Sequence, residues 1–100
     1  MDHPIYRVVS FEKVASFTLK ITFDDDTTQI INFLPVLRGP LYGAMADEYL
    51  FDQVSLDPEV HTLVWPHGAD FDPTTLHDWP MYEESMIALA KRGEEKIMHE

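Results

Sequence analysis

The segment SFTLKITF, residues 16–23, alternates apolar and polar side chains and constrains the fold more than any other part of the chain. Successive side chains of a strand point to opposite faces of a sheet, so one face of this segment is apolar and the other is polar. A helix would need an apolar period near 3.6 residues. The pattern therefore predicts a half-buried strand with one face toward solvent. Its apolar face carries Phe17, Leu19, Ile21 and Phe23.

Two further strands are predicted beside this one. Residues 5–13 (IYRVVSFEK) are rich in β-branched and aromatic side chains, which favours a strand. Residues 28–33 (TQIINF) follow the short acidic segment DDDT at 24–27, and this arrangement predicts a hairpin.

The middle of the chain predicts short elements. Residues 34–45 contain two prolines and two glycines, which exclude a long regular element. Residues 45–54 fit a short helix, and residues 53–57 and 59–65 fit two short strands around an Asp-Pro turn. The predicted class is α+β: an antiparallel sheet of about five strands, with a short helix after the third strand and a helix at the C-terminus. Residues 1–79 form the body, and residues 80–100 form the last helix and tail of the same domain.

Residues 80–100 have helical spacing, and the helix is expected either to stop at Gly93 or to continue into the residues after it. Tyr82, Met86, Leu89 and Ala90 lie on one face of this helix. That face predicts either a lid packed on the open face of the sheet or a partner-binding surface made by Tyr82, Met86 and Leu89. The lid is the preferred interpretation.

The segment VWPHGADFDPTTL, residues 64–76, concentrates unusual residue types. Each has a structural explanation: an aromatic core residue, a proline that ends a strand, a glycine with positive φ, aspartates that accept backbone N–H groups, and a proline in a first helical turn. These residues are, in that order, Trp65, Pro66, Gly68, Asp70, Asp72 and Pro73.

A small-ligand or metal-dependent enzyme is the alternative interpretation of this segment. It would use His61, His67, Asp70 and Asp72, and a metal site could also draw on His77, because carboxylates near histidines can bind a divalent cation. No pair has the strict spacing of a known metal motif, and no serine lies in a nucleophile elbow. We therefore assign no catalytic residue, no metal ligand and no cofactor from the sequence.

Charge and composition limit the classes of binding partner and the cellular location that we expect. The formal net charge is −11, which disfavours direct binding to nucleic acid or to anionic membranes and makes a basic protein the easier partner. The preferred interpretation of this charge is that it keeps the domain soluble. The chain has no cysteine, no apolar run long enough for a membrane span and no signal-peptide pattern, which predicts a cytoplasmic protein. Its oligomeric state is expected to be monomer or homodimer.

The chain resembles the small bacterial family called domain of unknown function 2442. The resemblance lies in three segments that follow one another along the chain: LKITFDDDTTQIINFLPVL, GPLYGAM and FDQVSLDPEVHTLVWPHGADFDP. The resemblance covers residues 5–79 and departs at His67, where the family often has Asn, and at Asp26, where it often has Gly. It implies an α+β domain without an established activity. It also implies pairing with a second small protein from a neighbouring gene, as in toxin–antitoxin systems. The sequence thus favours an acidic protein-interaction module, the antitoxin-like member of such a pair, over the enzyme.

Overall fold

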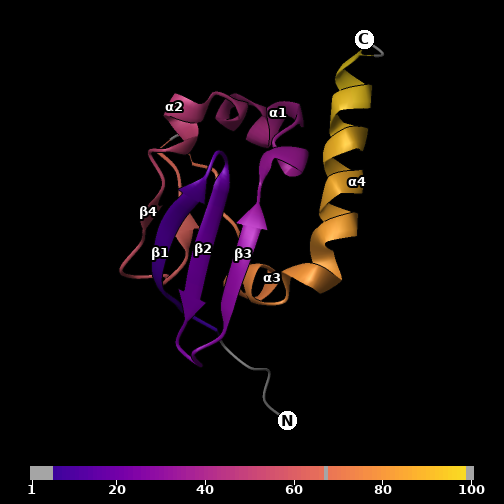
Figure 1. Ribbon diagram of the computed structural model, residues 1–100. Helices are drawn as coiled ribbons and strands as arrows, with labels where there is room; N and C mark the ends of the chain where they lie inside the picture. Colours follow the sequence, from indigo (N-terminus) through magenta and orange to yellow (C-terminus); the bar gives the residue numbers. More distant parts are fainter. Residues whose placement is uncertain (1–5, 67, 99–100) are drawn as a thin grey trace.

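Three antiparallel strands form the main sheet of the computed structural model, which describes residues 6–66 and 68–98, with side chains at all of these except 40, 41 and 93–98 (Figure 1). The order is β1 (Val8–Ala15), β2 (Thr18–Phe23) and β3 (Thr28–Asn32). The predicted alternation is confirmed, since Ile21 is fully buried and Lys20 is exposed. Register places Lys20 opposite Ile30 on the outer face of the sheet.

The two tight turns of this sheet place non-glycine residues at positive φ. Phe17 (φ 56°) lies in the turn before β2, so this strand begins two residues later than predicted. The Phe17 ring still packs on Phe51, with centroids 5.3 Å apart. In the acidic turn Asp26 adopts φ 70°, a conformation that Asp tolerates better than most residues. The hairpin therefore forms without the glycine that is frequent there in the family it resembles.

A second, two-stranded sheet is made by β4 (Ser55–Leu56) and β5 (Leu63–Val64). Both strands are shorter than predicted, because the Asp57 side chain accepts the N–H groups of Glu59 and Val60 and curls the connection into a turn. The α+β class and the total of about five strands are confirmed, although the strands are divided between two sheets.

Short helices connect the two sheets, as the prolines and glycines predict. They are η1 (Leu34–Val36), α1 (Gly39–Tyr42), η2 (Gly43–Ala46) and α2 (Glu48–Phe51). The predicted helix at 45–54 is reduced to α2, whose first turn is capped by the Asp47 carboxylate, which accepts the Tyr49 N–H at 3.0 Å. The adjoining η2 ends at the same Asp47, which is in an extended conformation and separates the two helical pieces.

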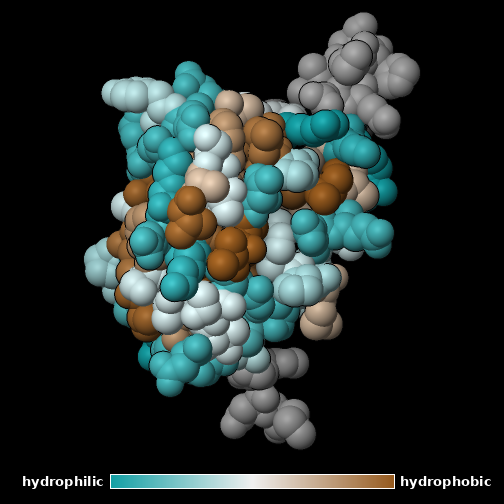
Figure 2. All heavy atoms as spheres, viewed as in Figure 1, coloured by the Kyte–Doolittle hydropathy of each residue, from teal (hydrophilic) through white to brown (hydrophobic). Residues whose placement is uncertain are grey.

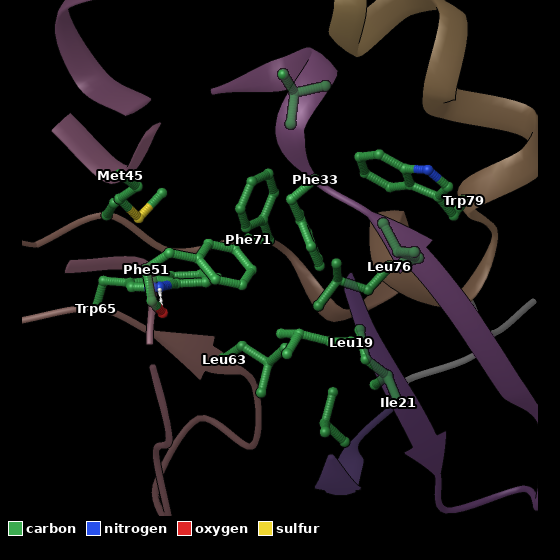
Figure 3. Close-up of a cluster of buried hydrophobic side chains, with 14 of the residues drawn as sticks. Leu19, Ile21, Phe33, Met45, Phe51, Leu63, Trp65, Phe71, Leu76 and Trp79 are labelled. Carbon is green, nitrogen blue, oxygen red and sulfur yellow. Dashed lines mark hydrogen bonds between the residues drawn. The ribbon is translucent and has the colours of Figure 1, made fainter. Parts of the chain in front are cut away.

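The core lies between the inner face of the main sheet and the layer formed by α2, the β4–β5 pair and the segment that follows it (Figures 1 and 3). Phe33 is at its centre, and its ring centroid lies 5.2–6.2 Å from those of four other aromatic residues. These four are Phe51, Trp65, Phe71 and Trp79. Aromatic rings at these separations provide both apolar burial and favourable ring contacts.

The chain ends with α3 (Pro73–His77) and α4 (Trp79–Met98). The helix continues through Gly93 to Met98, so the structure shows the second of the two alternatives expected for the residues after Gly93. The predicted lid over the open face of the sheet is wrong: α4 packs along α1 and η1, beyond β3 (Figure 1). Trp79 and Ala90 are buried, and Met86 and Ile87 pack on the core, whereas Tyr82 and Leu89 lie on the exposed side of the helix.

Candidate functional site

The motif that follows β5 forms a tight loop whose described residues have structural roles. Trp65 is buried, and its indole N–H donates to the Phe51 carbonyl at 2.8 Å (Figure 3). Gly68 has φ 97° and donates its N–H to the Trp65 carbonyl at 3.0 Å, while the Trp65 N–H donates to the Ala69 carbonyl at 2.9 Å. Only glycine enters this backbone region at little cost. The loop therefore returns the chain to the core at Ala69.

The two aspartates of the motif lie on either side of the buried Phe71. Asp70 bridges to Val64 through the backbone, and its carbonyl accepts the Tyr42 hydroxyl at 3.0 Å. The Asp72 carboxylate accepts the Thr74 N–H at 3.3 Å and caps α3, whose first residue is Pro73. Pro66 is exposed immediately after the strand.

The residues of the alternative enzyme are only partly brought together. His61 and Asp72 line one shallow hollow of about 360 Å³, which Arg7 and Glu59 also line. Asp70 does not line it, and His67 lies outside the described residues. Within residues 6–66 and 68–98, no three His, Asp or Glu side chains are arranged to hold a metal ion. The described part of the predicted set thus forms no ligand cluster.

His77, one of the candidates for a metal site, is held in a partly buried position by several contacts. The His77 side chain is 11% exposed and lies between two carboxylates, with Nδ1 2.8 Å from Asp78 Oδ1 and Nε2 2.8 Å from Asp25 Oδ2. Its ring stacks on Tyr6 and meets the edge of Phe23. This cluster joins the β2–β3 turn to the end of α3.

The environment of His77 favours its charged form. Burial lowers the pKa of His77. The hydrogen bonds with Asp78 and Asp25 and the negative charges of these residues together raise the pKa by more than burial lowers it, so the pKa lies above its ordinary value. The same contact with His77, together with the Thr27 N–H, lowers the pKa of Asp25. When His77 is protonated, the arrangement is an ion pair that joins segments distant in the sequence. The sequence signal for it is weak, because Asp25 and His77 are 52 positions apart.

The surface of α4 carries two features suited to binding. Pro80, Glu83, Glu84 and Ile87 line a shallow hollow of about 340 Å³, and both glutamates are exposed. Elsewhere on the helix an apolar stripe is formed by the three residues predicted for partner binding. Leu89 is 56% exposed, Tyr82 is 37% exposed, and Met86 connects them to the buried face.

Comparison with known proteins identifies one family over most of the chain. The model of the family described as "Protein of unknown function (DUF2442)" matches residues 8–80. The chain belongs to this family. The predicted resemblance is thereby confirmed over nearly the same residues, and the loop described above lies inside the match. No curated protein and no solved structure matches the chain. Among the described residues of this DUF2442 protein, no helix has the length and apolar character needed to cross a membrane.

Proposed function

We propose that this DUF2442 protein is an acidic protein-interaction module, the antitoxin-like member of a two-gene system, and that α4 binds a basic protein encoded by the neighbouring gene. The observation that carries the proposal is the hollow on α4, where the carboxylates of Glu83 and Glu84 stand beside the apolar atoms of Pro80 and Ile87.

This combination fits a lysine or arginine side chain. The long aliphatic part of such a side chain packs on apolar surface, while its charged end seeks water or a carboxylate. In the hollow, Pro80 and Ile87 supply the apolar surface, and Glu83 and Glu84 supply the negative charge. Hydrogen bonds between ionised partners are stronger than neutral ones, so even a shallow site of this kind discriminates by charge.

The apolar stripe of Tyr82, Met86 and Leu89 supplies the second half of the interface. Met81, which is 75% exposed, widens the apolar surface next to Tyr82. Tyrosine and methionine are enriched in protein interfaces, and methionine adapts its shape to a partner. A single helix thus offers a charged hollow and apolar anchors, which is the composition of an amphipathic docking surface.

The charge of the whole chain supports a basic partner. At −11, the protein attracts a basic protein over distances of the order of the Debye length, and it repels nucleic-acid phosphate. Such attraction raises the association rate more than it raises the final affinity.

The experiment is a binding titration against the product of the neighbouring gene, with the double charge reversal Glu83→Lys and Glu84→Lys. We expect the double variant to bind at least about tenfold more weakly, because two attractive contacts become repulsive. The control is the double variant Glu12→Lys and Glu59→Lys, which makes the same change in net charge. Both of these glutamates are exposed and lie outside α4. Equal weakening by both double variants would leave only an effect of net charge and would refute a site on α4.

A further inference from the structure

The free edge of β3 is a second surface with a definite chemistry. In the order β1-β2-β3 this strand has a neighbour on one side only. Two hydrogen bonds fix the phase of its ladder with β2: the Phe33 N–H donates to the Phe17 carbonyl, and the Phe23 N–H donates to the Thr27 carbonyl. In an antiparallel pair, hydrogen-bonded residue pairs alternate with non-bonded ones.

This alternation determines which backbone groups of β3 bond to β2 and which remain free to bond to a further strand. The N–H and C=O groups of Gln29 and Ile31 point toward β2, so those of Thr28, Ile30 and Asn32 point away from it. All three outward-pointing residues are exposed. No other described segment bonds to their backbone groups within residues 6–66 and 68–98.

The opposite edge of the same sheet is protected. On β1 the register shifts at Val9 and at Val14, and such irregularities twist an edge away from a new strand. The Val8 N–H donates to the His61 carbonyl at 2.9 Å, and Lys13 adds a charge. These are the devices by which natural sheets prevent further pairing.

On β3 the register shifts and the charge are missing, although α3 contacts this strand and the Gln29 side chain donates to the His77 carbonyl at 2.7 Å. Its sequence, TQIIN, has no charge, no proline and no glycine, and it pairs with β2 without a register shift. Ile30 is 64% exposed at its centre. An edge strand with exposed outward-pointing residues and with no charge, proline or bulge is a template for an additional strand.

The charges around the edge of β3 favour one kind of binding partner. The exposed turn Asp24–Asp26 lies at the N-terminal end of β3, and the chain carries −11 in total. A second copy would bring the same charge and would be repelled, whereas a basic segment would be attracted. Figure 2, viewed onto the face of the main sheet, shows separate hydrophobic patches on a largely hydrophilic surface.

We propose that an extended segment of a basic protein adds to the free edge of β3 as a further strand, with an apolar side chain beside Ile30 and a basic side chain toward the Asp24–Asp26 turn. This inference rests on the proposed function and specifies a second part of its interface. Because α4 stands beyond the same edge of the sheet (Figure 1), one partner can reach both surfaces.

The test uses the full chain and a synthetic probe, the acetylated and amidated peptide Lys-Val-Lys-Val-Lys-Val-Lys. Backbone amide signals are followed by NMR during titration at low ionic strength, together with amide hydrogen exchange. We expect the Ile30 amide to exchange at least about tenfold more slowly in the complex, since it becomes a ladder donor. The alternating peptide Glu-Val-Glu-Val-Glu-Val-Glu controls for charge and should not bind.

Substitution at the edge sharpens this test. Ile30→Pro removes a donor that points away from β2, so the existing ladder is retained, as prolines at sheet edges are tolerated. We expect it to weaken the peptide about tenfold, while the matched Ile30→Thr, which keeps the N–H, changes affinity less than about threefold.

Three results would overturn the proposal. Binding with signal changes confined to α4 and unchanged exchange at Thr28, Ile30 and Asn32 would reject the edge site and leave the proposed function standing. Absence of any binding by the basic peptide would reject the edge site, while the proposed function stays tested by the separate titration against the neighbouring gene product. Protection of Ile30 that increases with protein concentration alone would assign the edge to a second copy of the chain instead.

Discussion

The imidazole ring of His77 lies flat against the phenol ring of Tyr6, with centroids 3.5 Å apart and planes inclined by 8°. This contact joins the segment before β1 to the end of α3. Because the same imidazole is held between Asp25 and Asp78, one titratable group connects three parts of the fold. Protonation of His77 therefore has consequences for stability.

We predict that the contribution of His77 to stability depends on pH in a defined direction. Its pKa in the folded state is raised, so its stabilising effect is complete below the unfolded value of about 6.5 and is lost as pH rises through the folded value. The pKa of Asp25 is lowered in the folded state. Asp25 therefore stabilises the fold at pH above its unfolded-state pKa and loses this effect as pH falls through its folded-state pKa. Urea unfolding of wild type and His77→Gln between pH 5 and pH 9 measures this, and the difference should shrink toward alkaline pH.

A matched control for this prediction is His61→Asn. His61 has φ 55°, which Asn tolerates, and among the described residues its side chain has no ion pair. We expect a small difference from wild type that does not vary with pH in the same way. A stability difference for His77→Gln that is constant from pH 5 to pH 9 would show that the ion pair does not operate.

The turn glycine of the motif should be sensitive to any side chain. Gly68 has φ 97°, and a Cβ there would meet no atom within 4 Å, so the cost comes from backbone strain alone. We expect Gly68→Val to lower the free energy of unfolding by about 1–3 kcal/mol. Gly43→Ala is the control, because Gly43 has φ −61° and an added Cβ would make ordinary contacts. It should be neutral or slightly stabilising, and equal losses in both variants would contradict the strain argument.

The alternation along β2 predicts a large effect of substitution on stability at one position and a small effect at the next. Ile21→Ala should lower the free energy of unfolding by about 2–4 kcal/mol, because the side chain is fully buried and its removal leaves a cavity. Lys20→Ala should change it by less than about 0.5 kcal/mol, because Lys20 is on the exposed face. Thermal and urea unfolding measure both, and similar losses would mean that the outer face is covered.

Local patterns in the sequence predict those features that depend on neighbouring residues. The alternation in residues 18–23, the positive φ of Gly68 and the cap by Asp72 each follow from residue type and spacing. The burial of Trp65 follows from its place after an apolar strand.

Features that depend on distant residues could not be predicted in this way. The pair of His77 and Asp25 joins positions far apart in sequence, and no periodicity indicates it. The division into two sheets depends on which strands pair, and the patterns of residues 53–57 and 59–65 do not indicate that these strands form a separate pair. The buried face of α4 was predicted only in part: Trp79, which precedes the predicted helix, is buried against Phe33, whereas Leu89 is exposed.

The exposed position of Leu89 allows a direct test of the proposed interface. Leu89→Glu places a charge where the side chain is 56% exposed, so the free protein should unfold within about 0.5 kcal/mol of wild type. Ala90→Glu, one position further along, puts the same charge on the buried face and should destabilise by several kcal/mol. Together the two variants distinguish the exposed side of α4 from the packed side.

The decisive measurement is the affinity of Leu89→Glu for the neighbouring gene product, determined by calorimetric titration beside a Val60→Glu control that adds the same charge at an exposed apolar residue off α4. We predict that Leu89→Glu loses at least about tenfold in affinity with an unchanged melt, while Val60→Glu binds as wild type. Wild-type affinity of the Leu89→Glu protein would contradict the assignment of α4 as the binding surface.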